Sequence, residues 1–130
     1  MGVEILLLID DSDIDNLVNQ RIIERAGFAS KIVVKKSAWQ GLEFLNETLA
    51  KNPADLPQLI LLDIRMPDLD GFGFLEEFKK LDVFIQELCK IALLTSSIDS
   101  DDFRRASENP LVKKFLNKPL TAKALAELKL

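Results

Sequence analysis

Two apolar runs in this sequence end on aspartates, and that arrangement suits the binding of a cation. The run VEILLLI (3–9) is followed directly by Asp10 and Asp11, and the run LILL (59–62) is followed by Asp63. Three carboxylates within ~5 Å of one another repel by roughly 3 kcal/mol per pair at an effective dielectric constant near 20. Hard divalent cations with oxygen ligands relieve such repulsion, so the pattern predicts a magnesium site at Asp10, Asp11 and Asp63.

A hydroxyl and an ammonium group follow two further apolar runs. CKIALLT (89–95) ends on Thr95, and Lys118 comes directly after VKKFLN (112–117). Phosphoryl transfer needs a nucleophile and groups that neutralise the oxygens of the transferred phosphoryl group. Asp63 could be that nucleophile, because a cation and Lys118 would both keep it ionised, while the metal, Thr95 and Lys118 would neutralise the oxygens.

The elements that bring these residues together are predicted from hydrophobic patterning. Five apolar runs are expected to be strands, and the first, third and fourth are nearly continuous, as in parallel strands covered on both faces. Helical patterns alternate with the strands and predict an α/β domain with a five-stranded parallel sheet and helices on both faces. Ligands of such sheets bind beyond the carboxyl ends of the strands, where all the candidate residues lie. The expected strands are 3–9, 30–36, 56–62, 89–95 and 112–117, and the expected helices are 11–28, 37–51, 71–81, 100–109 and 121–130.

Individual side chains on these elements have simpler interpretations. The first helix has Ile14, Leu17, Val18, Ile22 and Ile23 at helical spacing. Asp13 and Asp15, in its first turn, are interpreted as helix-capping acids. Trp39 is interpreted as a packing residue and Cys89 as a buried small hydrophobe.

Composition excludes several classes of function. The 130 residues suit one domain, and 48% are hydrophobic, which is enough for a substantial core. No apolar run approaches the ~20 residues of a membrane span. The first residues lack a basic region followed by a signal-type apolar stretch, so secretion is not expected. The single cysteine fits a reducing compartment, so a cytoplasmic protein is expected, and the net charge of −4 argues against direct nucleic-acid binding. The absence of histidine excludes a histidine base, a phosphohistidine or a histidine metal ligand within this chain.

Four motifs together resemble the response-regulator receiver domain of two-component signalling. LLIDDS, LILLDIRMPDLDG, ALLTSS and FLNKP occur in the order and spacing of that family along the whole chain. The resemblance implies the flavodoxin-like receiver fold with strand order 2-1-3-4-5. It also implies one receiver domain over residues 1–130, with no output domain in this chain.

The resemblance also implies a role for each acid. Asp63 matches the aspartate that accepts a phosphoryl group from a histidine kinase or a histidine phosphotransfer protein. Asp10 and Asp11 match the acidic pair that binds Mg²⁺, with Asp11, Asp63 and the backbone carbonyl of Arg65 as direct ligands.

The remaining matched residues belong to the switch. Thr95 matches the hydroxyl that binds the phosphoryl oxygens, Lys118 matches the lysine that pairs with them, and Phe115 matches the aromatic switch residue. The Lys118–Pro119 bond is expected to be cis, which aims the lysine into the site. The surface formed by the helix at 100–109, the strand at 112–117 and the last helix is then expected to change shape for an unknown downstream protein. The domain is expected to be a monomer or a weak, phosphorylation-dependent dimer, and a signalling phosphoacceptor rather than an enzyme.

Some positions depart from the commonest pattern of the family. Arg65 is long and cationic where the family often has a smaller polar residue, so Arg65 and Ser97 are expected to tune the lifetime of the phosphorylated state. Phe115 has no hydroxyl, so its inward movement would have to be steric. Pro110 is expected to end the helix before the fifth strand or to begin the following loop.

Three alternative functions remain open. A magnesium-dependent phosphatase or nucleotidyl-transfer enzyme would need a second acid two residues after the nucleophile, where this chain has Arg65. A flavodoxin-like binding module would need a phosphate-binding first loop, whereas DDSDID would repel phosphate. A degenerate receiver would act as a constitutive interaction surface without phosphorylation.

Overall fold

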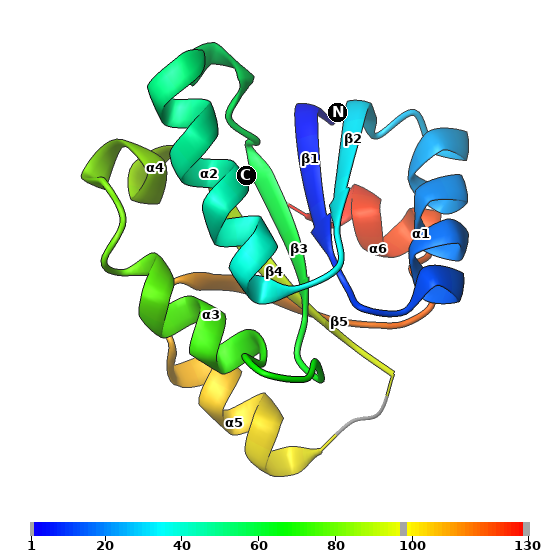
Figure 1. The fold of residues 1–130 in the computed structure, drawn as a ribbon. Helices are drawn as coiled ribbons and strands as arrows, with labels where there is room; N and C mark the ends of the chain where they lie inside the picture. The colour runs from blue at the N-terminus through cyan, green and yellow to red at the C-terminus, as the bar shows by residue number, and fades with distance from the viewer. Residues whose placement is uncertain (1, 97–98, 129–130) are drawn as a thin grey trace.

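A computed structural model describes residues 2–96 and 99–128 and shows a five-stranded parallel sheet in the order β2-β1-β3-β4-β5 (Figure 1). The predicted fold class and strand order are therefore confirmed. The elements are β1 (Val3–Ile9), α1 (Asp13–Arg25), β2 (Ala29–Lys35), α2 (Ala38–Lys51), a short 3₁₀ helix η1 (Pro53–Asp55), β3 (Leu59–Asp63), α3 (Gly71–Phe78), α4 (Val83–Leu88), β4 (Lys90–Thr95), α5 (Ser100–Glu108), β5 (Val112–Asn117) and α6 (Ala122–Ala126).

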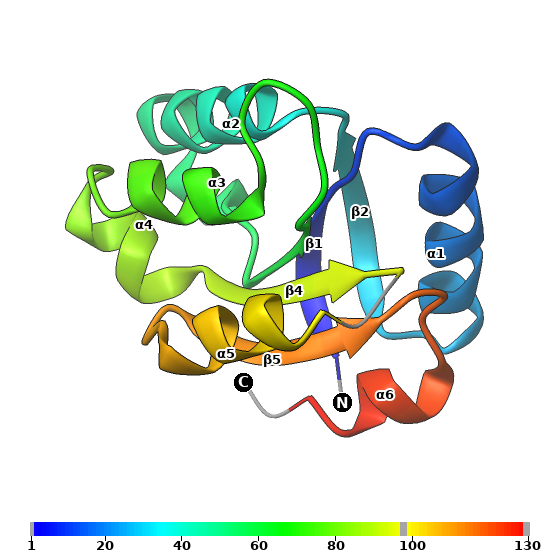
Figure 2. The same ribbon diagram turned by 90° about the horizontal axis from the view of Figure 1, so that it is seen from below.

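Helices cover both faces of the sheet, which explains the continuous apolar runs of its central strands. In β1, Leu7 and Ile9 pack with the residues of α2 and α3, whereas Leu6 and Leu8 pack on the opposite face with those of α1 and α6. All four side chains are fully buried. Figure 2 shows α1 and α6 on one side of the molecule, away from α2 and α3.

One helix was missed by the sequence prediction. The segment between α3 and β4 forms α4, six residues in which Ile85 is buried and the Asp82 carboxylate accepts a hydrogen bond from the Phe84 backbone N–H. A pattern this short has too few turns to show helical periodicity. The helix predicted at 71–81 accordingly ends earlier, at Phe78.

Helix α1 forms where it was predicted, but most of its apolar residues do not face the core. Ile14 and Leu17 are 74% and 51% exposed, and of the apolar residues spaced along the helix only Ile23 is fully buried. The side chains buried beside Ile23 are instead Asn16 and Asn19. The helical spacing thus predicted the helix correctly, although of these apolar residues only Ile22 and Ile23 pack against the core.

Two other side-chain predictions have opposite outcomes. Cys89 is buried, as expected, and burial raises the pKa of its thiol to about 12. Trp39 on α2 is 53% exposed, so only about half of its side chain packs against the protein, and the prediction of a packing residue was wrong for the other half.

Pro110 follows α5 and lies in the loop before β5, as predicted.

Within the described residues, no helix combines the length and apolar character that a membrane crossing requires.

Candidate functional site

Three carboxylates meet at the carboxyl ends of the central strands. Ile9 pairs with Leu62 in the register of β1 and β3, so Asp10 and Asp63 follow at the same edge of the sheet. One carboxylate oxygen each of Asp10, Asp11 and Asp63 lies within 4.8 Å of the others. Asp10 and Asp63 are buried and Asp11 is exposed, so the cluster is open to solvent on one side only.

Lys118 places an ammonium group among these carboxylates. Its Nζ lies 2.8 Å from Asp10 Oδ2, 2.9 Å from Asp15 Oδ2 and 3.2 Å from Asp63 Oδ1, and its side chain is only 8% exposed. The Lys118–Pro119 peptide bond is cis, as the resemblance implied. The predicted convergence of Lys118 and the acids is therefore what the structure shows.

The site changes the pKa of Asp63 and the pKa of Lys118 for different physical reasons. Burial, together with the charge of Asp10, raises the pKa of Asp63 to about 6, although Lys118 opposes the shift. Burial by itself would lower the pKa of Lys118, but hydrogen bonds to Asp10 and Asp15 and the charge of Asp63 raise it above its ordinary value. At neutral pH Asp63 is thus mainly ionised and Lys118 is charged.

Asp15 has a different role from the one predicted. The helix cap of α1 is Ser12, whose hydroxyl accepts from the Asp15 backbone N–H at 3.2 Å. The Asp15 carboxylate binds Lys118, and Asp13 pairs with Lys36 at 2.7 Å. Both acids lie in the first turn of α1 as predicted, but neither is its N-cap, and each also pairs with a lysine.

Two buried asparagines that sequence reasoning missed connect α1 to the site. Asn16 Nδ2 donates to the backbone carbonyl of Asp10 at 2.8 Å, and Asn19 Oδ1 accepts from the backbone N–H of Leu120 at 3.2 Å. One bond holds the loop that carries the acidic pair, and the other holds the loop that carries Lys118. The available signal was two asparagines three residues apart, which lie on the same face of a helix.

The ends of β4 and β5 complete the edge of the sheet. Thr95 is buried at the end of β4, opposite Asn117, and its carbonyl accepts from the Lys118 backbone N–H at 2.8 Å. Phe115 is half-buried and makes an edge-to-face contact with Phe103 of α5, with ring centroids 5.5 Å apart. Ser97, predicted to affect the phosphoryl lifetime, lies outside the described residues.

The side chain of Arg65 points toward α5. Its Nη2 is hydrogen-bonded to the Asp102 carboxylate and lies 3.7 Å from Asp99 Oδ2. Nearby, a Cβ at Gly71 would lie 2.8 Å from the Asp63 carbonyl oxygen, so glycine is needed where α3 begins against the end of β3. Sequence reasoning did not find Asp99 and Asp102, whose contacts with Arg65 span 34 and 37 residues.

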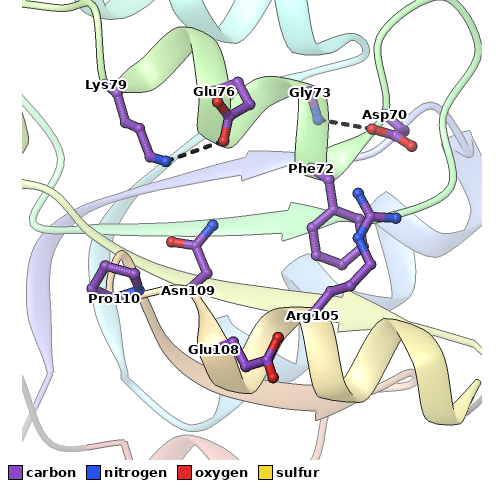
Figure 3. A pocket seen from close by; sticks show the side chains of 9 residues that line it. All are labelled: Asp70, Phe72, Gly73, Glu76, Lys79, Arg105, Glu108, Asn109 and Pro110. Atoms are coloured by element: carbon purple, nitrogen blue, oxygen red, sulfur yellow. Dashed lines mark hydrogen bonds and ion pairs between the residues drawn. The ribbon is translucent and has the colours of Figure 1, made fainter.

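One hollow of the molecule lies away from this site. It has a volume of about 470 Å³ and lies between α3 and α5, where Figure 3 shows the guanidinium of Arg105 over the ring of Phe72. Arg105 Cζ is 3.9 Å from the centroid of that ring. A smaller hollow of about 270 Å³ adjoins the acids, lined by Asp15, Val18, Asn19, Ser96, Lys118 and Pro119.

The acidic cluster has the donor set of a hard divalent cation. The ammonium group of Lys118 pairs with the carboxylates of Asp10, Asp15 and Asp63, and Asp11 adds a fourth carboxylate to the cluster. A divalent cation would bring this group of charges close to neutrality, and its preferred ligands are carboxylate and carbonyl oxygens. The residues therefore fit a magnesium-type ion.

The comparisons with known proteins agree with this geometry. The family model of the response regulator receiver domain matches residues 6–128. The chain is 32% identical over 117 residues to the probable methanogenesis regulatory protein FilR2 of Methanothrix harundinacea, which covers 90% of this chain and 73% of that protein. It is 31% identical over 121 residues to the sensor histidine kinase CheAY of Helicobacter pylori, where it covers 93% of this chain and 14% of that protein.

A solved structure extends the agreement to three dimensions. The crystal structure of a two-component response regulator from Cytophaga hutchinsonii has a TM-score of 0.89 and 32% sequence identity, and covers 97% of this chain and 93% of that chain. Receiver domains are signalling modules of two-component systems that interact with histidine kinases or phosphotransfer proteins and with downstream targets. The chain belongs to the response regulator receiver domain family.

Proposed function

We propose that this receiver domain accepts a phosphoryl group on Asp63 from a phosphohistidine of a partner protein. The observation that supports this most strongly is the position of Asp63, which is buried, 3.2 Å from Lys118 and within 4.8 Å of the acidic pair. The 130 residues contain no histidine, so the donor phosphohistidine lies outside them.

In the proposed reaction, a carboxylate oxygen of Asp63 attacks phosphorus in line with the donor nitrogen. The O–P bond forms as the N–P bond breaks, and the electron pair of that bond stays on the imidazole nitrogen, which takes a proton from solvent. Lys118 and the Thr95 hydroxyl bind oxygens of the transferred group and balance its charge. Asp10, Asp11, Asp63 and the backbone carbonyl of Arg65 would hold Mg²⁺, which supplies further charge neutralisation when bound.

We infer that the donor protein docks on the exposed apolar side of α1. Ile14, Leu17 and Val18 form an exposed patch, and Val18 also lines the hollow that contains Lys118. Asp15, within the same turn, binds Lys118 directly. A protein that covers this patch would therefore present its phosphohistidine at the mouth of the site.

Phosphorylation would then change the surface of α5, β5 and α6. Thr95 moves toward the phosphoryl oxygens, and the space that it leaves at the end of β4 is filled by Phe115, whose ring gains burial. We propose that a downstream protein recognises this altered surface and that residues 1–130 act as one receiver domain, monomeric or weakly dimeric when phosphorylated. Arg65 and Ser97 would set how long the phosphoryl group persists.

The test is intact mass spectrometry after incubation with Mg²⁺ and acetyl phosphate. Wild type should gain one phosphoryl group and Asp63→Asn should gain none. Asp68→Asn is the matched control, because it makes the same charge change in the loop after β3 at an exposed residue with a φ of 68°, a conformation that asparagine tolerates. Labelling of Asp63→Asn would contradict the assignment, and no labelling of wild type would favour a degenerate receiver.

A further inference from the structure

The ion pair between Arg65 and Asp102 joins the loop of the phosphoacceptor to the first turn of α5. Of the residues that the structure describes, the buried carboxylates are those of Asp10, Asp63 and Asp102, and only the last lies outside the acidic cluster. Asp102 is 7% exposed and its carboxylate is hydrogen-bonded to Arg65. A buried carboxylate that loses its partner is strongly destabilised, so this contact has consequences for α5.

Arg65 is also within reach of the phosphoacceptor. It follows Asp63 by two residues, which span at most about 7 Å of extended chain. The Arg65 side chain is 59% exposed, so solvent surrounds most of it and leaves it room to reorient. A guanidinium has five N–H donors in a planar fork, which suits phosphoryl oxygens as well as carboxylates.

We propose that Asp102 is a positioning residue that holds the Arg65 guanidinium away from Asp63, and that a phosphoryl group on Asp63 competes with Asp102 for it. This inference rests on the proposed phosphorylation of Asp63. It concerns the side chain of Arg65, whereas the metal contact proposed above uses its backbone carbonyl.

The charges at the site give the direction of this competition. With one divalent cation, the four carboxylates and Lys118 keep one net negative charge. Phosphorylation converts the single negative charge of Asp63 to about two, so the site gains about one more. Arg65 is the cation nearest in sequence to that added charge. Its hydrogen-bonded partner Asp102 carries a single charge, and Asp99 adds a longer contact at 3.7 Å.

Transfer of Arg65 to the phosphoryl group would loosen the N-terminal end of α5. Asp102 would lose its hydrogen-bonded partner, and Asp99, whose Oδ2 lies 3.7 Å from Arg65 Nη2, would lose an ion pair. On the side toward α3, a hollow of about 470 Å³ lies between the two helices, and the stacking of Arg105 on Phe72 is one contact that spans it (Figure 3). The first turn of α5 is thus able to move while that stacking contact stays in place.

The test measures binding of beryllofluoride with Mg²⁺ by the full chain. Asp102→Asn keeps the shape of the side chain but removes its charge, so it should free Arg65 and tighten beryllofluoride binding by roughly fivefold, because a larger fraction of the protein is then ready to bind. Asp102→Glu should restore the wild-type affinity. Asp101→Asn is the control: it removes the same charge from the same turn, but its side chain is 80% exposed and lies 3.4 Å from Arg104.

A second background separates positioning from a general effect on folding. With Arg65→Gln, the change Asp102→Asn should alter beryllofluoride affinity by less than about twofold, because the contested side chain is absent. Amide exchange at 100–104 should rise on beryllofluoride binding in wild type and stay unchanged in Arg65→Gln, a comparison that does not need a folded Asp102→Asn protein.

The outcomes distinguish this inference from the proposed function. If wild type binds beryllofluoride and Asp102→Asn binds it equally well, or if Asp102→Asn has the same effect with and without Arg65, the inference is overturned and the phosphoacceptor assignment stands. If wild type binds no beryllofluoride at all, both are overturned.

Discussion

The two faces of the sheet are closed by helices of opposite character. Helix α2 buries Ala38, Leu42 and Leu45 against a cluster that includes Phe74 and Phe78. On the other face, α1 contributes Ile23 and the partly buried Ile22 to a smaller cluster and buries two asparagines beside them. It exposes Ile14, Leu17 and Val18. Helix α2 is amphipathic in the ordinary sense, whereas α1 buries polar side chains and exposes most of its apolar ones.

The difference shows which helix serves the core and which serves the site. The polar groups buried under α1 are bonded to the loops that follow β1 and β5, and these loops hold Asp10 and Lys118. Helix α1 is therefore fixed to the site by hydrogen bonds, and its apolar side chains are available to another molecule. On the other face, hydrophobic burial holds α2 and α3 against the sheet.

The largest expected effect tests this difference directly. Leu45→Ala on α2 should lower the free energy of unfolding by about 2–5 kcal/mol, since it leaves a cavity in the core. Leu17→Ala on α1 should change it by less than about 0.5 kcal/mol, because that side chain is 51% exposed. Urea denaturation followed by circular dichroism measures both. Equal losses would mean that α1 contributes to the core in solution as α2 does.

How far the sequence could predict these faces depends on the kind of signal. Continuous runs such as LILLD specify strands buried on both sides, so the sheet, its class and the convergence of Asp10, Asp63 and Lys118 follow from the patterning and the strand ends. The buried face of α1 cannot be predicted from the patterning, because periodicity shows only that residues share a face and not whether that face is buried.

The missed contacts share one property. Asn19 binds a residue 101 positions away, and Arg65 binds one 37 positions away. Such pairings depend on the packing of α1 and α5 against the sheet, which no local pattern encodes. The same long separation in sequence explains why Asp15 was interpreted as an acid that caps its own helix, although its carboxylate also binds Lys118.

The second prediction concerns the charged edge between the two faces. Because the pKa of Asp63 is about 6 in the folded protein against 3.8 ordinarily, the native state keeps a proton that the unfolded state has lost between about pH 4 and pH 6. Stability should therefore fall as the pH rises through that window, by up to ~3 kcal/mol from this group alone. In the presence of a metal chelator, Asp63→Asn should remove this fall.

The measurement is the free energy of unfolding of both proteins at pH 4 and pH 7 in EDTA. The Asn variant should be the more stable at pH 7, and the difference should be small at pH 4. Adding Mg²⁺ at pH 7 should stabilise wild type more than the variant. A variant less stable than wild type at pH 7 would show that Lys118, and not burial, dominates the environment of Asp63.

The third prediction tests whether α1 is held by its polar groups. Asn16→Ala should lower stability by about 1–3 kcal/mol, because the buried carbonyl of Asp10 loses its donor. It should also weaken Mg²⁺ binding, measured by calorimetry, because the loop of the acidic pair is released. Asn46→Ala, at an exposed position of α2, is the control and should change neither quantity. Loss of stability with intact Mg²⁺ affinity would limit Asn16 to a structural role.

The smallest effect is expected from the exposed side of α1, and it separates docking from chemistry. Leu17→Ser removes apolar surface that the donor protein is proposed to cover, so phosphotransfer from a histidine kinase that labels the wild type should slow by about tenfold. Labelling by acetyl phosphate should stay at the wild-type rate, because that donor needs no docking surface. Trp39→Ser, at the exposed aromatic residue of α2, is the matched control and should leave both rates unchanged. If Trp39→Ser slows the kinase reaction and Leu17→Ser does not, the donor docks on α2, and the exposed apolar side chains of α1 need another explanation.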